Sequence, residues 1–150
     1  MHNIKNFVPL GNVENAGKQT AALVIIEDWH NRLLMQLRDA DKPIVYPGCW
    51  TLFGGGVEKG ETPQNAAIRE LNEEIGICVF GEKLIPSAVT LSTDCRKELI
   101  YIFSVKLDIS PKDICLQEGA GFAFLDRKQL EKINVIPYVS DAIEHYYSMR

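Results

Sequence analysis

The sequence contains few cysteines, and their spacing suits neither a metal site nor a disulfide framework. The four cysteines, Cys49, Cys78, Cys95 and Cys115, include no C-x-x-C pair, and no histidine lies at a metal-ligand spacing. Zinc sites and disulfide-rich domains repeat cysteines at short, regular spacings. We therefore predict four reduced thiols in or near the core.

The sequence also lacks a long apolar run and an excess of basic charge. Its longest uninterrupted apolar stretch, Ala21 to Ile26, has the length of a strand and not of a membrane span. The first ten residues contain Lys5, Asn6 and Pro9, unlike the apolar segment of a signal peptide. The net charge is −4, whereas proteins that bind nucleic-acid polymers present a basic face. We expect a cytoplasmic protein that binds neither a nucleic-acid polymer nor a membrane.

A chain of 150 residues can bury one self-sufficient core, so we expect residues 1–150 to form a single domain. Thr62 and Pro63 are typical of a helix start and Gly76 of a helix end, which predicts a helix over 63–75. Gly54 to Gly56 are interpreted as a turn before it. Apolar runs predict a hairpin of strands 21–26 and 33–37, further strands at 50–53, 88–91, 99–107 and 121–125, and helices at 127–133 and 139–149, with strand 99–107 central. This order predicts an α/β fold with a mixed sheet.

The helix over 63–75 carries an unusual density of glutamates. Glu70, Glu73 and Glu74 are related by steps of three and four residues, which place them on one helical face. Three carboxylates on one face suit a hard divalent cation such as Mg²⁺ or Mn²⁺. The alternative is a solvated helix face. Solvated faces usually alternate acidic and basic residues, and this helix has only Arg69 as a base, which favours the metal site.

Two neighbouring features support this interpretation. Arg69 is able to reach back to Glu61 and hold the preceding loop against the helix through a bidentate pair. Glycine lets the backbone approach a charged ligand, so Gly54 is a candidate to offer its carbonyl to the same metal. A divalent cation among carboxylates commonly serves phosphoryl chemistry, because it neutralises diphosphate oxygens and helps deprotonate water.

The segment 55–77 resembles the Nudix box, G-x5-E-x7-R-E-U-x-E-E-x-G-U with U aliphatic. The matching residues are Gly55, Glu61, Arg69-Glu70-Leu71, Glu73-Glu74 and Gly76-Ile77. The preceding segments 33–38 and 50–54 are also similar to the family, apart from Phe53-Gly54 where many members have Leu-Pro-Gly. The resemblance implies an α/β/α sandwich with a mixed sheet and a loop-helix-loop catalytic motif.

In that family the box binds Mg²⁺ or Mn²⁺ and hydrolyses a diphosphate joined to another moiety. The resemblance implies that Glu70, Glu73 and Glu74 bind the metal together with the carbonyl of Gly54. It also implies that Glu61 and Arg69 form a scaffolding ion pair.

Residues outside the box supply further candidates. Glu118 stands where family members often have another acidic residue near the metals, and an exposed loop glutamate is the alternative. Trp50 and Tyr138 are each able to stack on a nucleobase, although packing is the more common role of such residues. Asp141 is able to read a base edge, but the asparagine that guanine-selective members place near the last helix is absent.

We therefore expect a Mg²⁺-dependent Nudix hydrolase, active as a monomer or homodimer on a small diphosphate-containing molecule, either a nucleoside triphosphate or a nucleotide sugar. Two alternatives remain. Isopentenyl diphosphate isomerases share the fold, but they lack the full hydrolase box and use a cysteine placed differently from Cys49. A nucleotide-binding sensor without catalysis usually lacks some of the box glutamates, and all are present here.

Overall fold

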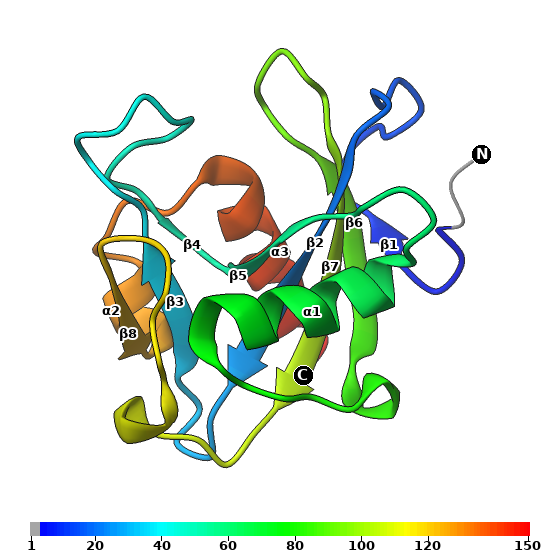
Figure 1. The fold of residues 1–150 in the computed structure, drawn as a ribbon. Helices are drawn as coiled ribbons and strands as arrows, with labels where there is room; N and C mark the ends of the chain where they lie inside the picture. Colours follow the sequence, from blue (N-terminus) through cyan, green and yellow to red (C-terminus); the bar gives the residue numbers. More distant parts are fainter. Residues whose placement is uncertain (1–3) are drawn as a thin grey trace.

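A computed structural model describes residues 4–150, in which a mixed β-sheet lies between helices (Figure 1). The strands are β1 (Val8–Pro9), β2 (Thr20–Glu27), β3 (Leu33–Leu37), β4 (Trp50–Thr51), β5 (Phe53–Gly56), β6 (Ile85–Leu91), β7 (Leu99–Lys106) and β8 (Gly121–Leu125). The helices are α1 (Pro63–Ile75), α2 (Arg127–Leu130) and α3 (Pro137–Ser148), with single 3-10 turns at Gly81–Lys83 and Pro111–Asp113. No helix among these residues is long and apolar enough to cross a membrane.

Six of the strands follow the order β1-β6-β7-β2-β3-β4, while β5 pairs with β2 and β8 pairs with β3. β7 runs parallel to β2 along its whole length and antiparallel to β6. A strand with a neighbour on both edges and a layer on both faces is apolar almost throughout. This confirms the predicted mixed sheet and the central place of the strand that begins at Leu99.

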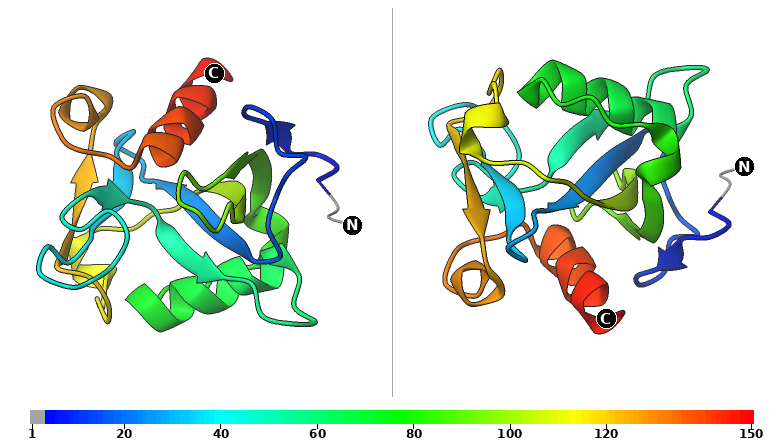
Figure 2. Two further views of the ribbon diagram at one scale, coloured as in Figure 1. Left: turned by 90° about the horizontal axis from the view of Figure 1, so that it is seen from above. Right: turned by 90° about the horizontal axis from the view of Figure 1, so that it is seen from below.

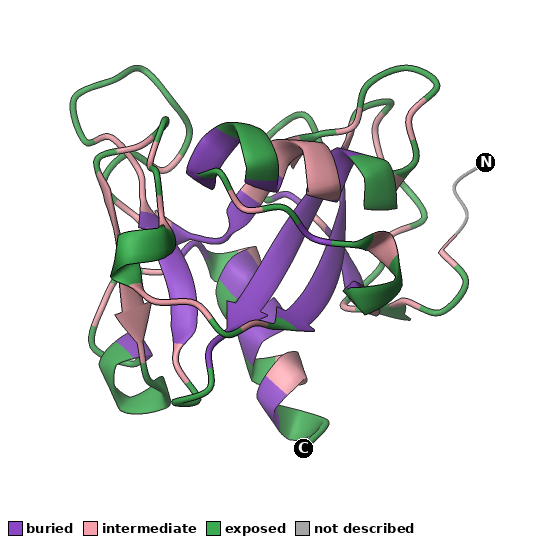
Figure 3. Ribbon diagram, turned by 60° about the horizontal axis from the view of Figure 1, so that its bottom comes forward, coloured by how far each residue is buried: buried purple, intermediate pink, exposed green. Residues whose placement is uncertain are grey.

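Strand β2 explains how the two helical layers are attached. Successive side chains of a strand point to opposite faces. Ala22 and Val24 accordingly pack in the cluster that contains α1, and Leu23 and Ile25 pack in the cluster that contains α3. Figure 2 shows α1 and α3 on opposite faces of the sheet, and Figure 3 shows the buried strands between the exposed outer surfaces.

The sheet divides beside β2. β5 pairs with Ala21 to Val24 of β2, whereas β3 meets β2 only where Leu33 faces Glu27. The predicted hairpin is therefore paired at a single register position, and β3 turns to pair along its length with β8. Because β3 and β5 diverge from the same edge of β2, space opens between them. The candidate site lies in that space.

Gly54 to Gly56 form a strand, so the predicted turn at these residues is wrong. Gly54 has φ of 139°, and a Cβ there would lie 2.1 Å from the carbonyl oxygen of Ala22. Only glycine permits this conformation and this approach. The connection between strand and helix instead runs from 57 to 62.

Other predictions need smaller corrections. All four thiols are free, as predicted, but Cys78, Cys95 and Cys115 are exposed because they lie in connecting segments, and only Cys49 is partly buried. α2 ends at Leu130, three residues earlier than predicted, and a turn over 131–132 followed by a bend at 133 leads to Val135, which forms a bridge with Trp50. The last helix begins at Pro137, two residues before the predicted start, and strand β6 begins at Ile85, three residues before the predicted start. The edge strand β1 was not predicted, because two residues are too few to give a sequence pattern.

Candidate active site

The ends of α1 are set by local chemistry. The Thr62 hydroxyl accepts a hydrogen bond from the Asn65 amide at 3.1 Å, and Gly76 ends the helix with φ of 71°. Leu71 and Ile75 are fully buried against the sheet. The helix is therefore anchored along one side, and Glu70 and Glu74 lie at its boundary with β5.

The glycines of β5 allow Glu70 to lie against the strand. A Cβ at Gly55 would lie 2.6 Å from the carboxyl carbon of Glu70, which is far closer than ordinary contact. At Gly56 a Cβ would meet no atom within 4 Å. Glu70 can thus occupy its position only because residue 55 has no side chain, whereas a side chain at residue 56 would not disturb it.

Arg69 connects the loop before α1 to the helix. Its Nε donates to Glu61 Oε2 at 2.8 Å, and its Nη2 donates to Glu61 Oε1 at 3.0 Å and to the Gly56 carbonyl at 2.9 Å. Its Nη1 donates to Glu70 Oε1 at 2.9 Å and to Glu73 Oε2 at 3.2 Å. These side-chain hydrogen bonds lower the pKa of Glu61 to about 2 and raise the pKa of Arg69. The ion pair expected between Arg69 and Glu61 is present and bidentate.

Glu74 is buried, with 4% of its surface exposed. Burial raises the pKa of Glu74 to about 9, with further contributions from the contact with Glu70 and the charges of Glu70 and Glu118, while a hydrogen bond from the Gly54 amide acts in the opposite direction. A buried carboxyl beside two others carries its proton at neutral pH unless a cation replaces it.

The segment before β8 brings Glu118 to this point. The Gln117 amide donates to the Glu74 carbonyl at 2.8 Å, and the Gln36 side-chain amide donates to the Glu118 carbonyl at 3.0 Å. One bond ties the segment to the end of α1 and the other ties it to β3. Glu118 is exposed, and its charge acts on Glu74.

We call the cavity at this point the carboxylate cavity. It has a volume of about 150 Å³ and is lined by Gln36, Arg38, Asp39, Lys42, Ile44, Gly54, Glu74, Glu118 and Gly119. Its lining therefore contains three acidic side chains, Asp39, Glu74 and Glu118, and two basic ones, Arg38 and Lys42. Lys42 pairs with Asp39 at 3.1 Å, and Arg38 Nε donates to the Val45 carbonyl at 2.8 Å.

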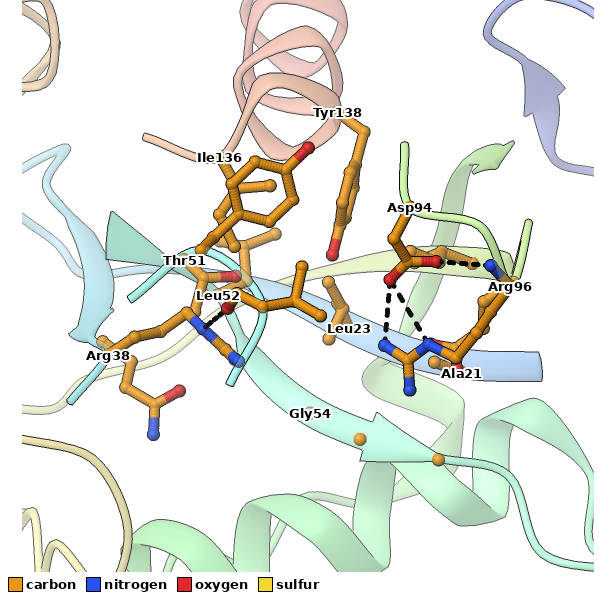
Figure 4. A pocket seen from close by; sticks show the side chains of 17 residues that line it. Ala21, Leu23, Arg38, Thr51, Leu52, Gly54, Asp94, Arg96, Ile136 and Tyr138 are labelled. Carbon is orange, nitrogen blue, oxygen red and sulfur yellow. Dashed lines mark hydrogen bonds and ion pairs between the residues drawn. The ribbon is translucent and has the colours of Figure 1, made fainter. Parts of the chain in front are cut away.

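A second cavity of about 150 Å³, the tyrosine cavity, adjoins the first and shares Gln36, Arg38 and Gly54 with it. Figure 4 shows its wall, where Tyr138 at the start of α3 and the paired Asp94 and Arg96 lie above β5. The remaining lining residues are Ala21, Leu23, Val45, Tyr46, Thr51, Leu52, Gly55, Gly56, Glu98, Ile100 and Ile136. Burial raises the pKa of Tyr138 to about 12, so its hydroxyl remains a hydrogen-bond donor.

Comparison with known proteins assigns the family. The NUDIX domain model matches residues 17–143, which is most of the chain. The chain belongs to the NUDIX family. It is a Nudix hydrolase, a pyrophosphohydrolase, and enzymes of this family act on small nucleotide molecules. The nucleoside triphosphatase NudI of Salmonella paratyphi B is 38% identical to it over 61% of this chain and 71% of that protein.

Solved structures agree with this assignment. A MutT Nudix hydrolase from Burkholderia pseudomallei superposes with a TM-score of 0.73 at 20% identity, over 85% of this chain and 96% of that one. The dihydroneopterin triphosphate pyrophosphohydrolase of E. coli gives a TM-score of 0.65 at 25% identity, over 88% and 97%. The predicted Nudix fold is confirmed, and the hydrolase is favoured over the isomerase-like and sensor alternatives.

Nudix enzymes generally use divalent metal ions, and the carboxylates of this Nudix site suit one. Glu70 and Glu74 are in contact, and Glu118 adds negative charge to a buried point, so a cation would relieve the repulsion. No three acidic, histidine or cysteine side chains within residues 4–150 are already arranged as a ligand set. Arg69 bonds one carboxylate oxygen of Glu70 and one of Glu73, which leaves the other oxygen of each without a contact to Arg69.

The structure separates the candidate residues. The side chain of Glu73 is 58% exposed and lines neither cavity. Asp141 is exposed and lines neither cavity, and Trp50 is partly buried in the cluster around α3. Tyr138 both packs in that cluster and lines the tyrosine cavity.

Arg38 and Gln36 line both cavities, although the sequence did not predict either as a site residue. The occurrence of two basic residues, Arg38 and Lys42, ahead of the box could have indicated a phosphate-binding role for Arg38. Gln36 had none, because its role depends on contact with a segment 82 residues away.

Proposed function

We propose that this enzyme hydrolyses a phosphoanhydride bond of a nucleoside triphosphate, with nucleotide sugars as the second substrate class, and that it requires Mg²⁺ or Mn²⁺. The observation that carries this proposal is the buried Glu74 in a cavity that also contains Arg38 and Lys42. The carboxylates suit a metal ion, and the two cations suit phosphate oxygens. The similarity to a nucleoside triphosphatase supports the choice of substrate.

The two adjoining cavities support this proposal, because a nucleoside triphosphate has two parts of different chemistry. The phosphates would lie in the carboxylate cavity, and the nucleoside would enter the tyrosine cavity across the shared Gly54. The lining of the tyrosine cavity includes the charged side chains of Arg38, Asp94 and Arg96, which offer hydrogen-bond partners to a nucleoside, and Tyr138 adds a hydroxyl donor.

We assign Glu70, Glu73 and Glu74, with the Gly54 carbonyl, as the metal ligands. When bound, the ion supplies charge neutralisation at the diphosphate and lowers the pKa of water. Arg69 and Glu61 hold the loop and helix in register.

In the chemical step, a water oxygen attacks phosphorus, the bond to the bridging oxygen breaks, and the water proton passes to a carboxylate. The products are a nucleoside monophosphate and either diphosphate or a second monophosphate.

We assign Glu70 as a metal ligand and base, and Glu118 as an auxiliary base. A general base contributes about 10² to 10⁴ in rate, so Glu70→Gln should lower kcat by about 10² or more. Glu118→Gln should lower it by about tenfold, as expected for a supporting group. If Glu118→Gln abolishes activity and Glu70→Gln retains it, the two roles are reversed.

A substrate panel tests the activity itself. Nucleoside triphosphates, nucleotide sugars, dinucleoside polyphosphates and prenyl diphosphates are incubated with Mg²⁺ in ¹⁸O-labelled water, and label in the phosphate products is measured. Hydrolysis must place label in a phosphate product, whereas isomerisation or binding alone places none. Tight binding across the panel without labelled phosphate would exclude the proposed function.

A further inference from the structure

Gln36 is a buried polar residue in an otherwise apolar strand. It lies in β3, Leu33–Leu37, has 7% of its surface exposed and lines both cavities. Burying an amide costs free energy unless it is hydrogen-bonded. Its Nε2 donates to the backbone carbonyl of Glu118 at 3.0 Å. The amide therefore connects the strand to the segment that carries a proposed base.

Gly119 packs closely against the same Gln36 amide. It has φ of 91°, and a Cβ there would lie 2.8 Å from Gln36 Nε2 and 3.0 Å from the Leu37 carbonyl oxygen. The next amide, that of Ala120, donates to this same carbonyl at 2.9 Å. Glycine at 119 thus lets the segment lie directly on β3, where Gln36 can bind it.

The attachments of the segment differ in kind. Two of them join backbones, from the Gln117 amide to the Glu74 carbonyl and from the Ala120 amide to the Leu37 carbonyl, whereas the bond from Gln36 comes from a side chain. Glu118 lies between them and is exposed, so its own side chain is not fixed by burial. The Gln36 amide is the attachment that a substitution can remove.

We propose that Gln36 is a positioning residue, which holds the backbone of Glu118 so that its carboxylate faces Glu74 in the carboxylate cavity. This inference rests on the proposed function for the part that Glu118 plays in hydrolysis. The hydrogen bond between Gln36 and the Glu118 carbonyl does not depend on that function and can be tested without substrate.

The test combines kinetics with amide hydrogen exchange. Gln36→Met keeps the length of the side chain and removes its donor. It should lower kcat by about tenfold, as loss of a supporting hydrogen bond does, and change KM by less than about twofold. Combined with Glu118→Gln it should lower kcat by less than a further factor of about two, because residues that act through one another are not additive. Exchange at residues 117–120 should become faster, while α1 stays protected.

Matched variants separate positioning from general damage. Gly119→Ala disturbs the same contact from the other side and should reproduce the loss of kcat. Gly121→Ala, where a Cβ meets nothing within 4 Å, and Thr90→Val, a buried polar residue of the same sheet outside both cavities, should keep activity. If Gln36→Met does not fold, Gly119→Ala can replace it in the comparison of single and double variants with Glu118→Gln.

Several results would overturn the inference. These are losses that multiply in the double variant, a raised KM at unchanged kcat, or unchanged exchange at residues 117–120. The raised KM would mean that Gln36 binds the substrate directly. A wild type that hydrolyses nothing on the panel defeats the proposed function instead, and hydrogen exchange still decides whether Gln36 holds the segment.

Discussion

Replacing the buried carboxyl of Glu74 by an amide should stabilise the metal-free enzyme while removing its response to metal. Glu74→Gln preserves the size of the side chain. The glutamine oxygen can still accept from the Gly54 amide, and its NH₂ can donate to Glu70 in place of a shared proton. The variant therefore removes a titratable group from a buried position and leaves the surrounding contacts satisfied.

The magnitude follows from proton linkage. The pKa of Glu74 rises from its ordinary 4.5 to about 9 on folding. Between these values the unfolded chain has released the proton that the folded chain still holds, so stability falls as pH rises. Each pH unit costs about 1.4 kcal/mol, and the interval from 4.5 to neutral pH costs about 3 kcal/mol. Below 4.5 both states are protonated, and this cost disappears.

Thermal unfolding in a chelating buffer measures the effect. At neutral pH Glu74→Gln should melt about 5–10 °C above the wild type, since 1 kcal/mol moves Tm by about 2–4 °C in a domain of this size. The advantage should vanish near pH 4.5. Excess Mg²⁺ should remove most of this difference, because ligand at about 100 times its Kd stabilises the wild type by about 2.7 kcal/mol and the variant by less.

Glu73→Gln is the matched control. Its carboxylate lies on the same helix but is 58% exposed, so its removal should leave the metal-free Tm nearly unchanged. A Glu74→Gln enzyme that melts below the wild type in chelator at neutral pH would refute the reasoning, as would an advantage that persists at pH 4.5.

Two further predictions concern the loop and the strand beside the helix. The pKa of Glu61 is lowered to about 2, so its contribution to stability is complete above its ordinary 4.5 and is lost as pH falls toward 2. Glu61→Gln should flatten this acid dependence of the urea midpoint, and an unchanged slope would mean that the pair with Arg69 does not stabilise the fold. Gly55→Ala should displace Glu70 and lower kcat by about tenfold or more, because its Cβ would lie 2.6 Å from that carboxyl carbon. Gly121→Ala, at a strand glycine outside both cavities with open space around its Cβ, should keep activity, and equal losses would contradict the steric argument.

The parts of the fold that were predictable depend on local signals. Thr62 accepts from the first turn of α1 and Gly76 has the positive φ that ends it, and both effects involve only neighbouring backbone. The run that begins at Leu99 is apolar up to Val105 apart from Ser104, because the strand is covered on both faces. In both cases the type of residue reflects its local environment directly, so the sequence was enough to predict the ends of the helix and the central strand.

The parts that were not predictable depend on pairing across the chain. Gly54 to Gly56 match a turn by composition, and they become a strand because Ala21 to Leu23 pair with them. Gln36 looks like an ordinary polar residue at the end of a strand until the segment of Glu118 is placed on it. The sequence alone does not indicate that β2 pairs with Gly54 to Gly56 or that Gln36 contacts Glu118.

The helix illustrates the same limit inside the motif itself. Helical spacing places Glu70, Glu73 and Glu74 on one face, and it treats them as equivalent. Packing then distinguishes them: β5 covers Glu74, Arg69 holds Glu73 at the surface, and Glu70 lies between, in contact with both Arg69 and Glu74. A cation that enters must therefore replace a proton at the buried carboxyl of Glu74, whereas Glu70 and Glu73 each bond Arg69 through one carboxylate oxygen and keep the other. The positive charge of Arg69 repels a cation at these two carboxylates while its hydrogen bonds orient them. The affinity for the cation should therefore depend on Arg69, even though Arg69 can never be a ligand.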